Sequence, residues 1–166
     1  MATSCILDLL IKVSNVTNSI PIFYEDCEEG HVAEFGSYSV TKEEVIEFAT
    51  LYDPQSFHLD EETAKGSIFG RLAASGWHTC AMSMRMVVDH LKSIGSDPIV
   101  GAGIKDLKWK KPVYPGDTLS IRVVLGGKKP HPSKPFGFVE LNYEILNQKD
   151  VVTTSYNTTV LMPLRG

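Results

Sequence analysis

The feature that most constrains the fold is one strongly apolar helical pattern followed by a series of strand patterns. Within residues 75–91, apolar residues recur at the spacing of one helix face, at Trp77, Cys80, Ala81, Met84, Val87, Val88 and Leu91. Beyond Gly95, β-branched and aromatic runs alternate with turn residues, over residues 103–113, 118–125, 138–146 and 151–162. This order predicts an α+β domain in which an antiparallel sheet of consecutive strands wraps around one long central helix.

Shorter elements are expected before the long helix. Residues 36–40 have the pattern of a strand. Thr41 and Glu44 form a capping-box pattern, in which each side chain satisfies a free backbone donor, so a helix should begin there. It should end at Asp53, because the residue before a proline disfavours the helical conformation. Residues 60–66 combine an aspartate cap, an acidic first turn and a terminal glycine, which predicts a second, short helix.

Length and composition favour one soluble domain. The chain has 166 residues, of which 43% are hydrophobic, and we expect an N-terminal extension over residues 1–20 and a single domain over residues 21–166. The net charge of −4, without a broad basic face, argues against nucleic acid as a partner. No apolar run is long enough to span a membrane. The three cysteines form no disulfide or metal-ligand pattern, which favours the cytoplasm and no metal site.

The most informative chemical pattern is a carboxylate and an imidazole five residues apart. Asp53 stands at the expected helix end and His58 in the loop that follows, and Pro54 between them favours a turn. A turn of this kind can direct both side chains toward one water molecule, as hydration and dehydration chemistry requires. Taken singly, an aspartate here is commonly a helix-end residue, and a loop histidine is commonly structural or solvated.

Three segments, in order along the chain, carry a resemblance to a known family. Residues 53–58 read Asp-Pro-Gln-Ser-Phe-His and are similar to the motif D-x-N-P-x-H. Residues 69–76 are similar to F-G-x-x-x-A-x-G, and residues 111–119 to K-P-V-x-P-G-D-T-L. Over about residues 22–163 the chain therefore resembles the MaoC-like dehydratases, which are related to the (R)-specific enoyl-CoA hydratases and have the hot-dog fold.

The resemblance implies an activity and a set of site residues. Asp53 and His58 match the catalytic pair of the family, and Gly76 matches the glycine whose N–H faces the thioester oxygen. Ser75 and Gly76 open the long helix, where backbone donors are free to stabilise a developing oxyanion. A purely structural role for Gly76, allowing close helix packing, is the alternative. Gln55 stands where the family has asparagine, and its amide is a candidate for contact with substrate.

The implied reaction is the reversible hydration of a trans-2-enoyl-CoA to an (R)-3-hydroxyacyl-CoA in fatty acid metabolism. A hydro-lyase of this family needs no metal or redox cofactor. The CoA group is part of the substrate and is not a separate cofactor. The resemblance also implies a homodimer or higher homo-oligomer, with the sites near the interface. The residues do not decide which of Asp53 and His58 is the base. Two alternatives remain open, a hot-dog acyl-CoA thioesterase and a non-catalytic acyl-CoA-binding module.

Besides Gln55, a second change within the first motif and several other residues bear on this interpretation. Ser56 replaces the usual proline, which leaves the acid/base pair intact. Three polar residues of the long helix either reach the site or bond within the helix, namely His78, Thr79 and Ser83. Three other histidines are expected to be exposed, namely His31, His90 and His131.

Two further groups of residues have alternative interpretations. A basic hairpin either attracts CoA phosphates or is only a solvated connection, with its lysines at Lys128, Lys129 and Lys134. The methionines of the long helix suit core packing or the wall of an acyl groove, at Met82, Met84 and Met86.

Overall fold

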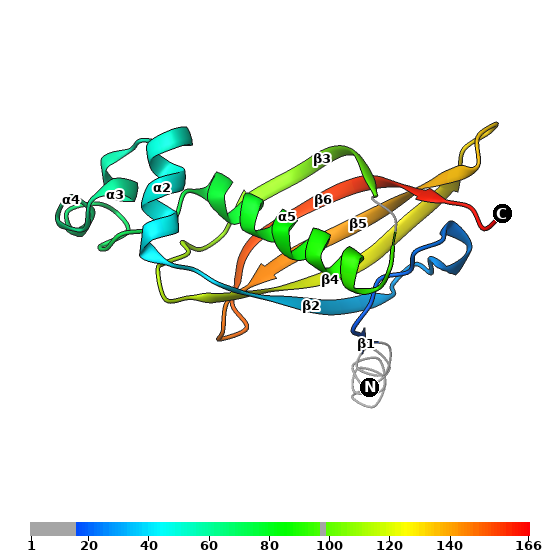
Figure 1. Ribbon diagram of the computed structural model, residues 1–166, viewed down its shortest axis with the longest axis horizontal. Helices are drawn as coiled ribbons and strands as arrows, with labels where there is room; N and C mark the ends of the chain where they lie inside the picture. Colours follow the sequence, from blue (N-terminus) through cyan, green and yellow to red (C-terminus); the bar gives the residue numbers. More distant parts are fainter. Residues whose placement is uncertain (1–15, 97–98) are drawn as a thin grey trace, which may run out of the picture.

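The long helix lies in the concave face of a curved sheet. The computed structural model describes residues 16–96 and 99–166, and its elements are arranged as in Figure 1. The central helix α5 (Gly76–Ser93) runs along the sheet, with the smaller helices gathered beyond its N-terminal end. The predicted α+β class and hot-dog fold, a sheet wrapped around one long helix, are confirmed.

Within the described residues the sheet has six strands in the order β1-β2-β4-β5-β6-β3. The strands are β1 (Val16–Thr17), β2 (Val32–Ser39), β3 (Val100–Trp109), β4 (Thr118–Pro130), β5 (Phe136–Leu146) and β6 (Val152–Pro163). All neighbours pair antiparallel except β1 and β2, which are parallel. A short 3-10 turn, η1 (Tyr24–Asp26), precedes β2.

The predicted order of strands is right for β4, β5 and β6 and wrong for β3. The first strand after α5 does not pair with the next strand along the chain, because β3 lies beside β6 at the edge of the sheet. Residues 110–117 cross the end of the sheet to reach β4. The Lys110 and Lys111 N–H groups both donate to the Thr153 carbonyl, and the Ala74 N–H donates to the Val113 carbonyl. This crossing segment brings β3, β6 and the start of α5 together.

The buried face of α5 also differs from the predicted one. Its buried residues are His78, Thr79, Met82, Ser83, Met86, Val87, His90 and Leu91. Of the predicted apolar face only Val87 and Leu91 are buried, whereas Trp77, Met84 and Val88 are exposed. The buried stripe of the helix therefore includes four polar side chains, and its most apolar stripe lies outside the core. The prediction that His90 is exposed is wrong, since its ring is buried and stacks on Phe35.

The segments before the predicted domain are only partly described. Residues 1–15, most of the predicted extension, lie outside the described residues. Within residues 16–20, Val16 and Thr17 pair with β2, and Ile20 is 3% exposed in the main core. The described part of this segment therefore packs on the domain.

Three helices connect β2 to α5, and local sequence explains their limits. Helix α2 (Lys42–Tyr52) begins at the predicted cap, where the Thr41 hydroxyl accepts a hydrogen bond from the Glu44 N–H. The Glu44 carboxylate does not complete the capping box and instead accepts a hydrogen bond from the Tyr38 hydroxyl. Helix α4 (Glu61–Lys65) has the predicted Asp60 cap and ends at a glycine. Between them lies α3 (Ser56–Leu59), where a loop was predicted.

Candidate active site

Asp53 is fixed at the end of α2 by backbone and side-chain hydrogen bonds. Its N–H donates to the Ala49 carbonyl, which caps the helix. Its carboxylate accepts hydrogen bonds from Gln55 Nε2 and Ser75 Oγ, both at 2.7 Å. Burial alone would raise the pKa of Asp53, but these two hydrogen bonds and the nearby His58 outweigh it, so the pKa is lowered. Asp53 is therefore held as a carboxylate.

His58 faces this carboxylate from the single turn of α3. The distance from His58 Nε2 to Asp53 Oδ2 is 3.5 Å, and the imidazole is buried. The other ring nitrogen, Nδ1, lies 2.7 Å from the Ala73 carbonyl oxygen. A carbonyl only accepts, so Nδ1 carries the proton and the neutral ring keeps its lone pair on Nε2. The predicted pair therefore shares one point in space, with its two acceptor atoms turned toward each other.

Gly76 begins α5 next to this pair. The Ser75 hydroxyl caps the helix by accepting the Trp77 N–H at 3.2 Å. As the first helical residue, Gly76 has no carbonyl one turn earlier to accept its N–H, and the helix dipole favours negative charge there. A Cβ at Gly76 would lie 2.4 Å from the Trp109 ring, so only glycine allows this close approach. Both interpretations of Gly76, close packing and an available donor, fit its surroundings.

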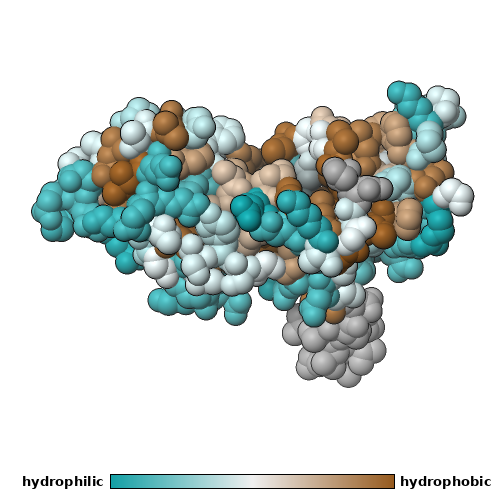
Figure 2. All heavy atoms as spheres, viewed as in Figure 1, coloured by the Kyte–Doolittle hydropathy of each residue, from teal (hydrophilic) through white to brown (hydrophobic). Residues whose placement is uncertain are grey.

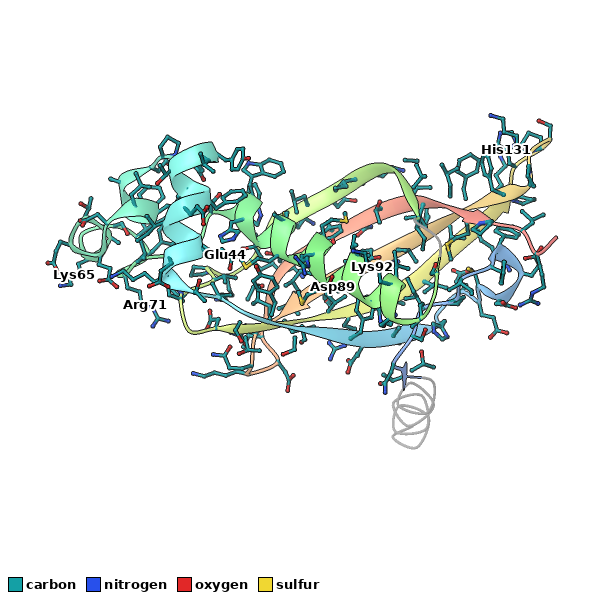
Figure 3. All side chains as sticks on the ribbon, in the orientation of Figure 1. Glu44, Lys65, Arg71, Asp89, Lys92 and His131 are labelled. Carbon is teal, nitrogen blue, oxygen red and sulfur yellow. The ribbon has the colours of Figure 1, made fainter. Side chains whose placement is uncertain are left out.

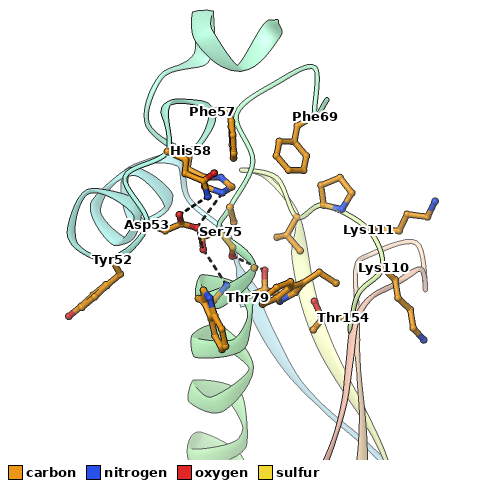
Figure 4. Close-up of a pocket in the computed structure, with 17 residues that line it drawn as sticks. Tyr52, Asp53, Phe57, His58, Phe69, Ser75, Thr79, Lys110, Lys111 and Thr154 are labelled. Atoms are coloured by element: carbon orange, nitrogen blue, oxygen red, sulfur yellow. Dashed lines mark hydrogen bonds and ion pairs between the residues drawn. The ribbon is translucent and has the colours of Figure 1, made fainter. Parts of the chain in front are cut away.

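These residues line one cavity of about 490 Å³, which we call the Asp53 cavity (Figure 4). All five predicted site residues line it, namely Gln55, Asp53, His58, Ser75 and Gly76. Its apolar wall consists of Tyr52, Phe57, Phe69, Ala74, Trp77, Trp109, Pro112 and Val113. Thr79 and Thr154 line it as well, and the side chains of Lys110 and Lys111 point away from Asp53 (Figure 4). The cavity thus joins a polar end to an apolar wall, as small-molecule sites do.

Several lining residues were missed in the sequence, and two candidates lie elsewhere. Trp109 and Thr154 come from β3 and β6, which are distant in sequence from Asp53 and pair with each other beside α5, so no local pattern marks them. Of the polar helix residues, only Thr79 lines the cavity. Ser83 donates to the Cys80 carbonyl and contacts the Tyr156 hydroxyl, as a bond within the helix and to the sheet. His78 points to the other side of α5.

His78 belongs to a second carboxylate–imidazole pair. Its Nε2 lies 3.7 Å from Glu44 Oε1, and Glu44 accepts a hydrogen bond from the Tyr38 hydroxyl. The ring stacks on Phe48 with 4.5 Å between centroids, and its Nδ1 is buried without a hydrogen-bond partner among the described residues. Burial lowers the pKa of His78, against the opposing effect of Glu44. This group lines a separate cavity of about 320 Å³ with Arg85.

The fold and the site together define a hot-dog protein of the hydratase/dehydratase class. The chain belongs to the MaoC-like domain family, whose model matches residues 27–143. An uncharacterized protein of Bacillus subtilis (strain 168), YdeM, is 32% identical over 133 residues, which cover 80% of this chain and 93% of that protein.

Solved structures show the same relationship. The MaoC-like dehydratase from Rhodospirillum rubrum has a TM-score of 0.79 and 35% identity, covering 88% of this chain and 99% of that one. The (R)-hydratase from A. caviae involved in PHA biosynthesis shares the fold, with a TM-score of 0.67 and 23% identity, over 84% of this chain and 99% of that one.

The described residues contain neither a metal-ligand cluster nor a helix of membrane-spanning character. Across residues 16–96 and 99–166, no three histidine, cysteine, aspartate or glutamate side chains gather as ligands for a metal ion. None of the helices in this part of the chain has the length and apolar character of a membrane span.

Proposed function

We propose that the protein reversibly hydrates a trans-2-enoyl-CoA of fatty acid metabolism to an (R)-3-hydroxyacyl-CoA in the cytoplasm. The observation that carries the proposal is the Asp53–His58 pair, which faces a cavity beside the Gly76 N–H. Family membership supports the reaction class, and the enoyl-CoA substrate is our extension of it.

The tautomer of His58 suggests how a water molecule is activated. A water placed between Nε2 of His58 and the Asp53 carboxylate finds two acceptors and donates one hydrogen to each. As the water oxygen forms a bond to C3 of the enoyl group, the O–H bond that points at Nε2 breaks, and its proton forms an N–H bond at Nε2 of His58. The lowered pKa of Asp53 keeps this carboxylate ionised, and its charge stabilises the imidazolium.

The second half of the reaction returns this proton. Addition at C3 moves the C2–C3 electron pair toward the thioester and places negative charge on its oxygen, where the Gly76 N–H stabilises it. The enolate then collapses, and C2 takes the proton from His58 Nε2. The sum is one water added, with OH at C3 and H at C2. Dehydration follows the same steps in reverse.

We also propose that the protein is a homodimer joined through β3. This strand is at the edge of the sheet, so one side of its backbone has no neighbouring strand within the described residues. Exposed apolar side chains lie on β3 and on the adjacent face of α5, namely Trp77, Met84, Val88, Val100, Ile104 and Trp109. Figure 2 shows hydrophobic residues gathered over β3. Trp77 and Trp109 also line the Asp53 cavity, so a second copy would complete its wall.

The decisive experiment follows loss of the conjugated enoyl-thioester absorbance with crotonyl-CoA and with longer and branched enoyl-CoAs. Wild type is expected to hydrate at least one of them, and the His58→Gln variant to lose about two or more orders of magnitude in kcat while staying folded. Release of free thiol from a saturated acyl-CoA, without hydration, would replace the proposal with a thioesterase. Binding without either reaction would indicate a binding module.

The assembly has its own test. Light scattering is expected to give the mass of a dimer for wild type and of a monomer for Ile104→Lys, because a charge at the centre of β3 would be buried without a partner. A wild-type monomer would overturn the proposed assembly.

A further inference from the structure

We propose that a second cavity beside the site binds the phosphorylated nucleotide of CoA, with Arg71, Lys111 and Lys149 as its phosphate-binding cations. The inference rests on the proposed function, because it assigns the part of the substrate that does not react. It names the free cofactor CoA, rather than a carrier protein, as the group that carries the acyl chain.

The cavity adjoins the site. Its volume is about 520 Å³, within the range of small-molecule sites, and we call it the Arg71 cavity. Lys111 and Pro112 line both this cavity and the Asp53 cavity, so the two share a wall. The Tyr114 hydroxyl donates to the Phe69 carbonyl, which ties the two walls together. The reacting group and the nucleotide of one extended ligand are therefore assigned to two adjacent cavities.

The charge of the cavity suits an anion. Arg71, Lys111 and Lys149 come from three separate segments, and none of them forms an ion pair within the described part of the chain. The cavity has one acidic residue, Asp117, and its carboxylate accepts from the Tyr114 N–H and from Gln148 Nε2. Three cations thus converge on a concavity of a chain whose net charge is −4. Such an arrangement attracts phosphate groups.

The Arg71 guanidinium of this cavity is held against an aromatic ring. The Arg71 guanidinium lies 3.7 Å from the centroid of the Tyr114 ring, in a cation–π stack. A guanidinium held in this way loses little freedom when it binds a phosphate with two parallel hydrogen bonds. CoA carries a pyrophosphate and a further phosphate on its ribose, which matches several cations in one cavity. A carrier protein brings a single phosphodiester and presents a protein surface, which needs a broad basic face instead.

The basic hairpin suggested by the sequence lies far from this place. Its residue His131 and Arg71 are at opposite ends of the molecule in Figure 3. Lys128 donates to the carbonyls of Tyr24 and Glu25, so it already holds a neighbouring loop. Lys129 and Lys134 form no ion pair within the described residues and therefore provide a matched control for the removal of two charges.

The experiment compares two substrates and two variants. Crotonyl-CoA and crotonyl-pantetheine share the reacting group, and only the first carries the nucleotide. The measured quantity is the ratio of their kcat/KM values. We expect Arg71→Gln/Lys149→Gln to lower this ratio about tenfold or more, through KM for crotonyl-CoA, and Lys129→Gln/Lys134→Gln to change it less than about twofold. A ratio that falls equally in both variants, or in neither, would overturn the inference.

A binding measurement separates this inference from the proposed function. Calorimetry with adenosine 3′,5′-bisphosphate needs no turnover and should show binding to wild type that weakens at least tenfold in Arg71→Gln/Lys149→Gln. If wild type binds this probe but hydrates no enoyl thioester, the nucleotide site stands and the reaction is wrong. If wild type hydrates crotonyl-CoA and crotonyl-pantetheine with equal kcat/KM and does not bind the probe, the site is wrong and the reaction stands. A strong preference for an enoyl carrier protein over crotonyl-CoA would also overturn the inference.

Discussion

Two carboxylate–imidazole pairs flank the first turn of α5, and they are alike in distance and in the burial of the ring but differ in their surroundings. Asp53 and His58 approach to 3.5 Å on one side of the helix, and Glu44 and His78 to 3.7 Å on the other. Both imidazoles are buried. The distance between the imidazole nitrogen and the carboxylate oxygen alone therefore does not distinguish a catalytic pair from a structural one.

The surroundings of the two rings distinguish them. The Nδ1 of His58 donates to the Ala73 carbonyl, which fixes its tautomer, whereas the Nδ1 of His78 is buried without a partner among the described residues. The Asp53 carboxylate takes two side-chain hydrogen bonds that lower its pKa. Only the first pair shares its cavity with Gly76. A reacting pair needs a fixed proton, a stable charge and a donor for the developing oxyanion, and one side of α5 combines all three.

The largest difference between the pairs should appear in kcat. We expect Asp53→Asn to lower kcat for enoyl-CoA hydration about 1,000-fold, because the neutral amide does not stabilise the imidazolium that forms on His58. Glu44→Gln should change kcat less than about threefold, since its amide oxygen still accepts a hydrogen bond from the Tyr38 hydroxyl. Stopped-flow hydration assays on both variants provide the comparison. A similar loss in both would mean that the second pair takes part in catalysis.

A smaller effect is expected for Ser75→Ala, which weakens the first pair without removing it. The variant loses the cap on the Trp77 N–H, at a cost of about 1 kcal/mol in the free energy of unfolding. It also loses a hydrogen bond to Asp53, so the pKa of that carboxylate should rise and kcat should fall about tenfold. The measurements are urea unfolding and the pH profile of kcat, whose acid limb should move to higher pH. Lower stability with an unchanged profile would limit Ser75 to helix capping.

The contrast between the pairs also shows which parts of the molecule could be predicted from sequence. The cap at Thr41 and the end of α2 at Asp53 follow from neighbouring residues, and the structure confirms them. Asp53 and His58 were predicted from their spacing around Pro54 and from family motifs; the structure places them beside one cavity, and their catalytic role stays a prediction. The position of β3 beside β6 could not be predicted, because it depends on a crossing between distant strands.

The face of α5 that is buried is a further case. Periodicity assigned the apolar stripe with Trp77 and Met84 to the core, yet the buried stripe is the one with His78, which packs on α2, and His90, which packs on β2. A helix pattern reports which residues share a face, but the partner of each face is set by tertiary packing. An apolar stripe left exposed by its own sheet is the reason that we propose a second copy as its partner.

A third prediction concerns the effect of the Glu44–His78 pair on the free energy of unfolding. His78→Phe removes the buried Nδ1 that has no partner and keeps a ring stacked on Phe48. An unsatisfied buried polar atom costs about 1 to 3 kcal/mol, so the variant should be as stable as wild type to within about 1 kcal/mol, despite losing its contact with Glu44. Urea unfolding measures the stability, and kcat should change less than about threefold. A loss above about 3 kcal/mol would show that His78 holds α2 against α5.

The smallest expected effect is in the pH dependence of stability. Burial lowers the pKa of His78 and of His90 below the ordinary value of 6.5. Between that value and the lowered one, the unfolded state binds more protons than the folded state, so the free energy of unfolding should fall as the pH drops below about 6.5. One such histidine contributes at most about 1.4 kcal/mol per pH unit in this interval.

The variants of the structural pair sharpen this expectation. Urea unfolding of wild type and His78→Phe at several pH values between 5 and 7.5 should give a shallower slope for the variant, because one of the two buried imidazoles no longer takes up a proton on unfolding. The remaining slope belongs to His90, whose Nε2 is likewise buried without a partner in the described part of the chain. Parallel slopes would show that His78 keeps a similar proton affinity in both states. The Glu44 carboxylate at 3.7 Å would then offset the burial of the His78 ring in full.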